Sequence, residues 1–282
     1  MAVSLSTLRK VKATFPPRTL IYGPPKMGKT TLASEFPGAV FIQTEQGENL
    51  DEITSFGKID SWDDVIEAVR VLYREEHDLK TVVIDSIDRL ENLIWAHTCA
   101  VHKWESVPGV DYGKGYGAAT VFWAQLFVGL NLLRTEKGMN VILIGHEEVD
   151  RFDDPRSASY SRFDFRLHKT AHAMIQNDMD IILFLNQKPG VQEEKIGFGG
   201  KRKVAAGTAQ RWMHLEGRPS YNAGNRYNMP PEAPYVLGQG YAALSQYFPV
   251  KSELMANAET AQATTETWSK AKQEYATAVT AR

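Results

Sequence analysis

The chain has 282 residues, of which 43% are hydrophobic and 23% are charged, and its formal net charge is −2. This length suits one large α/β domain, or one domain with appendages. The near-neutral charge excludes a general attraction to nucleic acid, so any such binding must use local patches. One cysteine, Cys99, excludes an internal disulfide and fits a reducing compartment. We see neither a signal peptide nor an apolar stretch long enough to span a membrane, and we expect a cytoplasmic protein without membrane contact.

The first predicted element is a short apolar strand at residues 19–22, which leads directly into Gly-Pro-Pro-Lys-Met-Gly-Lys-Thr at 23–30. This is the phosphate-binding pattern G-x-x-x-x-G-K-[ST], in the strand–loop–helix setting that the motif requires. Lys29 is expected to face the β- and γ-phosphates of ATP, and the Thr30 hydroxyl to bind Mg²⁺. Backbone N–H groups and the helix N-terminus complete the cradle. The residues predicted to hold the nucleotide are Gly23, Lys26, Met27, Gly28, Lys29, Thr30 and Thr31.

Two later strands are predicted to end in carboxylates beside this loop. The strand at 39–43 is followed by Glu45, and the strand at 81–84 runs into Asp85. Ligands of open α/β sheets bind outside the carboxyl ends of the strands. Glu45 could there accept a proton from attacking water, although it could instead only cap the next segment. Asp85 could hold Mg²⁺ directly or through water.

Helices are predicted after these strands. One starts at Ser61, which can form a capping box with Asp64, and a second occupies residues 87–104. His97, Cys99 and His102 lie on that second helix, but residues two apart point about 200° apart around the axis. We therefore expect no zinc site there.

A strand at residues 140–146 ends in Gly145-His146. At a strand end beside Asp85, the His146 side chain could touch the γ-phosphate or the attacking water and report the nucleotide state to the following loop. The alternative is a structural histidine.

Two segments are predicted to be loops that could bind single-stranded DNA. Residues 107–117 are rich in glycine, and residues 147–166 combine arginine with aromatic residues, the pattern that holds single strands without sequence preference. The second segment also holds six acidic residues against four arginines, so the arginines would have to face one way and the acids another. The first segment could instead be an ordinary surface connection, and connections as long as the second are usually functional or disordered. The DNA-binding candidates are Tyr112, Lys114, Tyr116, Arg151, Arg156 and Arg162.

After a helix at 167–177 and a strand at 180–185, residues 186–226 hold eight lysines and arginines and three glutamates. Short strands are expected near 201–206 and 210–215, and a peripheral helix in 251–282. In an oligomeric ATPase such cations can act on a neighbour's γ-phosphate, although they could equally form a solvated basic face. The candidates for this role in trans are Lys201, Lys203, Arg211 and Arg226. The predicted division is an N-terminal segment at 1–17, an ATPase domain at 18–235 and an extension at 236–282.

The order of these elements resembles the RecA-like ATPase core. Residues 39–45 resemble the strand with the catalytic glutamate, residues 81–86 resemble the Walker B strand, and Gly145-His146 falls where RecA proteins have Asn-Gln. Residues 22–32, 111–116, 167–171 and 223–226 resemble phage P-loop proteins of the AAA_24 type, some of which anneal or recombine single strands. The resemblance covers about residues 16–235. It implies a P-loop NTPase fold with a mostly parallel central sheet flanked by helices, a C-terminal β-rich extension and a peripheral helix.

Three functions are compatible with these features. The first is a Mg²⁺- and ATP-dependent recombination protein of a bacteriophage, which binds single-stranded DNA, promotes annealing or strand pairing and assembles into a homo-oligomeric ring or filament with nucleotide between protomers. It would work in the cytoplasm of the bacterial host. The second is a nucleotide-gated module that binds ATP without hydrolysis and acts on protein partners. The third is a small-molecule phosphotransferase, although the arginine-rich lid typical of nucleotide kinases is missing.

Overall fold

The computed structural model describes residues 15–45, 53–154, 158–188, 191–196, 200–205 and 210–249. A compact body comprises Pro17–Phe248. Residues 236–248, which the sequence assigned to the C-terminal extension, therefore belong to the same body as the P-loop. The predicted helix in 251–282 and most of the predicted N-terminal segment lie outside the described residues.

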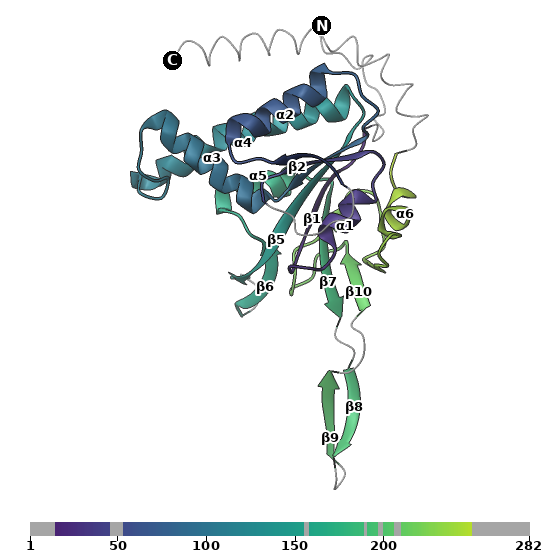
Figure 1. Cartoon of the computed structure of the whole chain (residues 1–282). Helices are drawn as coiled ribbons and strands as arrows, with labels where there is room; N and C mark the ends of the chain where they lie inside the picture. Colours follow the sequence, from purple (N-terminus) through teal and green to yellow (C-terminus); the bar gives the residue numbers. More distant parts are fainter. Residues whose placement is uncertain are drawn as a thin grey trace, which may run out of the picture. The chain divides into compact units, whose positions relative to one another are not determined.

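Within the described ranges, a mixed sheet of ten strands forms the centre of this body (Figure 1). Its parallel part has the strand order β7-β1-β5-β4-β2-β3. These strands are β1 (Arg18–Gly23), β2 (Ala39–Gln43), β3 (Thr54–Lys58), β4 (Thr81–Asp85), the first half of β5 (Asn140–Phe152) and β7 (Ile181–Lys188). Most are continuous apolar runs because both faces of the sheet are buried. The structure confirms the predicted α/β fold with a mostly parallel sheet.

Antiparallel strands extend the sheet on the side of β7. They are β10 (Gln210–His214), β11 (Gly224–Asn225) and β12 (Glu232–Pro234). Between β7 and β10 in the sequence, β8 (Val191–Ile196) and β9 (Gly200–Ala205) pair with each other in a separate antiparallel sheet. The predicted C-terminal β-rich region is therefore present.

Helices cover both faces of the sheet (Figure 1). The larger core lies under α2 (Trp62–Arg74), α3 (Ile87–His102), α4 (Lys114–Thr135) and α5 (Lys169–Asp178). The other face packs against α1 (Lys29–Ser34) and α6 (Gly240–Ser245). The predicted cap of α2 is present, since Ser61 Oγ accepts a hydrogen bond from the backbone N–H of Asp64 at 3.1 Å.

The two segments predicted to be loops are mostly regular structure. A short 3-10 turn, η2 (Asp111–Gly113), leads into α4 at Lys114, so the last four residues of the predicted loop at 107–117 are helical. Gly115 is needed there for close packing rather than for a flexible loop, because a β-carbon would lie 2.3 Å from the carbonyl oxygen of Val107.

The segment predicted as a long connection after His146 is a β-hairpin. β5 continues to Phe152 and pairs with β6 (Tyr160–Phe165), which places Asp150 opposite Arg162. An opposite-charge pair across two strands stabilises such a hairpin. Asp150 and Arg162 belong to the mixed charges that the sequence set against DNA binding, whereas Glu148 lies opposite another acid, Asp164, on the same ladder.

The segment Asp111–Thr135, which includes α4, is long and apolar enough to cross a membrane by length and composition. This differs from the expectation that no such stretch exists. Trp123, Leu126 and Leu130 of this helix are buried in the core, and α4 packs against α2, α3 and α5. These contacts are those of a core helix, a type that passes the same test of length and composition.

Candidate functional site

The P-loop joins β1 to α1 in the predicted manner. Gly28 has a left-handed φ of 97°, and Gly23 leaves no room for a side chain, since a β-carbon there would lie 2.1 Å from the carbonyl oxygen of Leu185. Lys29 is buried, and its Nζ donates hydrogen bonds to the carbonyl oxygens of Gly23 and Pro24, both at 2.9 Å. Burial lowers the pKa of Lys29, and the nearby carboxylates of Asp85 and Glu45 oppose that shift. The lysine is therefore aimed into its own loop.

Asp85 lies at the carboxyl end of β4, next to the P-loop. The Thr30 hydroxyl donates to Asp85 Oδ2 at 2.9 Å, so the two predicted magnesium ligands touch. Burial raises the pKa of Asp85 to about 6, although the hydrogen bond from Thr30 lowers it. Among the described residues, no group of three His, Cys, Asp or Glu side chains could hold a metal.

This donor set fits Mg²⁺ bound to a nucleotide. Mg²⁺ prefers oxygen ligands and usually keeps waters, binding through one or two protein groups plus substrate phosphates. Thr30 and Asp85 would hold it, and it would supply positive charge at the phosphates. The glycine-lined cradle and the inward-facing Lys29 fit the phosphate chain of ATP. The predicted cofactors are therefore compatible with the residues present.

β5 lies between β1 and β4, so the end of its parallel half, at His146, lies at the centre of the site. Gly23 is in register with His146, and Asp85 with Ile144. His146 Nε2 lies 3.9 Å from Glu45 Oε1, and its Nδ1 lies 3.0 Å from Asp88 Oδ1. The structure thus brings the predicted water-activating and sensing residues together.

Three residues that the sequence reasoning did not assign also take part in this site. Asp88 fixes the His146 ring, and Arg89 Nε lies 3.6 Å from Glu45 Oε2. Burial alone would raise the pKa of Asp88, but the hydrogen bond and charge of His146 lower it below its ordinary value. The sequence could have indicated a role for Asp88 and Arg89, because they lie in the first turn of the helix that directly follows Asp85.

Glu147 is the third such residue. Its Oε2 is buried and accepts no hydrogen bond from the described part of the chain. Burial raises the pKa of Glu147, and the charge of Lys29 opposes that change. A further carboxylate therefore lies within electrostatic reach of the P-loop lysine.

The trans-acting candidates have different surroundings. Arg226 donates to Asp180 Oδ1 at 3.1 Å, where Asp180 precedes β7 and so lies at the opposite end of the sheet from the P-loop. In its own chain Arg226 is thus an anchor for a buried carboxylate. Arg211 instead lies beside the P-loop of its own chain. The side chains of Lys201 and Lys203 lie outside the described residues, although their backbone belongs to β9.

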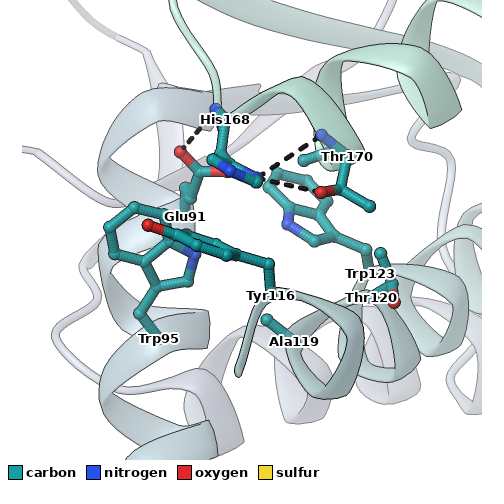
Figure 2. Close-up of a pocket in the computed structure, with 9 residues that line it drawn as sticks. Glu91, Trp95, Tyr116, Ala119, Thr120, Trp123, His168 and Thr170 are labelled. Atoms are coloured by element: carbon teal, nitrogen blue, oxygen red, sulfur yellow. Dashed lines mark hydrogen bonds between the residues drawn. The ribbon is translucent and has the colours of Figure 1, made fainter. Parts of the chain in front are cut away.

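Tyr116, one of the DNA-binding candidates, lines a small pocket between α3, α4 and α5 (Figure 2). Its ring stacks face to face on His168, with ring centres 3.6 Å apart, and Trp95 meets it edge-on. Glu91 accepts hydrogen bonds from the backbone N–H of His168 at the same place. One face of Tyr116 is therefore occupied, whereas Tyr112 is 98% exposed and Lys114 is also exposed.

On the β5–β6 hairpin, the candidate arginines have acidic neighbours. Arg162 Nη2 lies 2.7 Å from Asp164 Oδ2, and its guanidinium stands over the Phe152 ring at 4.3 Å. Arg151 Nε lies 3.2 Å from Asp153 Oδ1 on the surface. Arg156 lies outside the described residues. These contacts partly neutralise the charge that DNA phosphates would need.

A family described as an AAA domain (AAA_24) matches residues 16–227. The chain belongs to this family. A relative of this AAA domain protein is the SPbeta prophage-derived uncharacterized protein YorG of Bacillus subtilis (strain 168), which is 24% identical over 179 residues. The match covers 62% of this chain and 52% of the relative, so the chain spans about half the length of the curated relative that it matches.

Proposed function

We propose that this AAA domain protein is a Mg²⁺-dependent ATPase of the RecA-like type that acts on single-stranded DNA in phage recombination. The observation that carries the ATPase part is the convergence of Lys29, Asp85, Glu45 and His146 at one edge of the sheet. Membership of the AAA family supports the ATPase part, and the prophage-derived relative supports the part that concerns a phage. The cytoplasm of a bacterial host would be its place of action.

Each side chain has a separate task in hydrolysis. Lys29 neutralises charge on the β- and γ-phosphates as the terminal bond breaks. Glu45 orients the attacking water and accepts its proton. Asp88 holds the His146 ring through Nδ1, which leaves Nε2 facing Glu45 and the γ-phosphate position. Because His146 is followed directly by the β5–β6 hairpin, a change in its contacts can alter the hairpin that carries Arg151 and Arg162.

We expect a neighbouring protomer to add a cation to this site. In oligomeric ATPases a cation supplied in trans stabilises charge at the γ-phosphate. Lys201 and Lys203 remain candidates for that cation, and assembly into a homo-oligomer would follow. We therefore expect slow hydrolysis by the isolated protein.

The direct test is ATP hydrolysis with and without single-stranded DNA at two salt concentrations, with Lys29→Ala as the blank. DNA should stimulate turnover. The stimulation should weaken at the higher salt concentration, because contacts with DNA phosphates release counterions and DNA affinity therefore falls as salt rises. Unchanged hydrolysis with DNA at low salt would contradict the DNA-binding role but not the ATPase.

A second candidate is a nucleotide-gated module that acts on protein partners without hydrolysis. The pairing of Arg162 with Asp164 and of Arg151 with Asp153 favours it, because it removes cationic charge from the surface proposed for DNA. This alternative predicts tight ATP binding, no turnover and no response to DNA.

A further inference from the structure

A segment far along the chain is fastened to the helix that follows the P-loop. We call residues 232–245, which comprise β12, the following turn and α6, the C-terminal strap. Glu35, at the end of α1, accepts hydrogen bonds from the backbone N–H groups of Gly238 at 2.7 Å and Tyr241 at 2.9 Å, and from the Tyr235 hydroxyl at 3.1 Å. This strap lies beyond the residues that the family match covers.

The packing around Glu35 leaves little freedom for the strap. A β-carbon on Gly240 would lie 2.3 Å from Leu32 Cδ1 of α1, so the two helices touch closely. The backbone N–H of Tyr235 also donates to the carbonyl oxygen of Arg211 at 2.8 Å. The strap and β10 are therefore held together against α1.

Three side chains from the strap and β10 reach Gly28, the last glycine of the P-loop, and one of them is Tyr235, whose Cε1 lies 3.3 Å from the position of a β-carbon there. Leu237 Cδ2 lies 3.1 Å, and Arg211 Nη1 lies 3.7 Å, from the position that a β-carbon on Gly28 would occupy. The Arg211 guanidinium makes no ion pair with any residue in the part of the chain that the structure describes. A guanidinium without a carboxylate, held beside a phosphate cradle, is suited to bind a phosphate.

Exposed apolar surface lies next to this cation. Val236 is 51% exposed and Leu237 is 50% exposed, although both sit on a strap that is fixed to the core. Apolar side chains in such a place can cover the flat face of a base or a ribose. The combination of one cation and two apolar side chains matches a nucleotide, since the cation suits its phosphate chain and the apolar side chains suit its nucleoside.

The two sides of β1 carry different chemistry. Asp85 and His146 lie on β4 and β5, and Glu45 follows β2, all on one side of β1, which is where the proposed function places magnesium and the γ-phosphate. Arg211 and Leu237 come from β10 and the strap on the β7 side. If the γ-phosphate lies on the first side, the nucleoside can extend toward Arg211 and Leu237 on the second.

We propose that Arg211 binds the phosphate chain of the nucleotide held by its own P-loop, and that Val236 and Leu237 cover the nucleoside. The ligand class is a nucleoside di- or triphosphate, so this inference rests on the proposed nucleotide binding. It changes the expected role of Arg211 from a cation acting in trans to one acting in cis. The strap then selects nucleotides over bare polyphosphate.

The test uses the full-length protein and calorimetric binding of two probes, ATPγS and inorganic tripolyphosphate. Arg211→Ala should weaken both probes by about 10- to 100-fold, as expected for loss of a charge-assisted contact. Leu237→Ser should weaken ATPγS but leave tripolyphosphate unchanged. Arg218→Ala is the matched control, because Arg218 is exposed and lies 3.5 Å from Glu216.

Several results would overturn the proposal. One is wild-type affinity for ATPγS in a folded Arg211→Ala protein, with folding checked by its thermal unfolding curve. Another is restored turnover when Arg211→Ala and Lys29→Ala proteins are mixed, because that would place Arg211 in trans. If wild-type protein bound neither probe, the proposed nucleotide function itself would fail, which is a separate outcome.

Discussion

Glu91 carries a buried charge whose removal should stabilise the protein at alkaline pH. It lies on α3 and is 7% exposed, and its carboxylate accepts hydrogen bonds only from the backbone N–H of His168 within the described residues (Figure 2). Burial raises the pKa of Glu91 from 4.5 to about 7; the hydrogen bond from His168 lowers it, and the charges of Asp88 and Glu148 raise it further.

The direction of the pH effect follows from these values. Between pH 4.5 and pH 7 the folded protein binds a proton at Glu91 that the unfolded chain does not, so this group favours folding at low pH and opposes it as pH rises through 7. The difference corresponds to on the order of 3 kcal/mol of unfolding free energy above pH 7. Glu91→Gln keeps an oxygen that can accept from His168 and removes the charge.

Urea unfolding at pH 8 and pH 5 measures this effect. We expect Glu91→Gln to raise the free energy of unfolding by about 1–3 kcal/mol at pH 8 and by clearly less at pH 5. Glu105→Gln, a change at an exposed position, should have little effect at either pH. An equal gain at both pH values, or a loss at pH 8, would refute the reasoning.

Three further substitutions test other contacts. Asp88→Asn should lower ATP turnover about 10- to 100-fold with little change in ATP affinity, because it releases the His146 ring; weakened ATP binding with normal turnover would contradict a positioning role. Gly28→Ala should lower ATP affinity at least 10-fold, because φ is 97° and the new methyl group would meet Leu237, whereas Gly138→Ala, with open space around it, should leave affinity unchanged. Asp180→Ala should destabilise the protein by about 3–5 kcal/mol in thermal or urea unfolding, because the guanidinium groups of Arg18, Arg134 and Arg226 all lose their contact with this buried carboxylate, and a change below 1 kcal/mol would argue against that ion cluster.

The sequence predicted the part of the site that local patterns encode. Apolar runs that end in Gly23, Asp85 and His146 are strands, and parallel strands place their carboxyl ends at one edge of the sheet. The strand order then brings the predicted residues together without further information. The β5–β6 hairpin was missed because its pairing joins residues that are separated in the sequence, such as Asp150 and Arg162, and no local pattern encodes that pairing.

The strap could not be predicted from local patterns. Glu35 contacts Gly238 and Tyr241, about 200 residues later, and no motif marks either end of that contact. Arg211 was recognised only as one cation in a basic segment. Its position beside Gly28 follows from the antiparallel pairing of β10 with β7, which is a property of the folded sheet.

The central claim is that ATP is hydrolysed at the edge where Glu45, His146 and Lys29 meet. The most direct measurement compares ATP binding and steady-state phosphate release for wild type and Glu45→Gln, with Lys29→Ala as the blank. The site predicts that Glu45→Gln binds ATP as wild type does but loses at least 100-fold in turnover, since the water-orienting carboxylate is gone. Full turnover by Glu45→Gln would contradict the assignment.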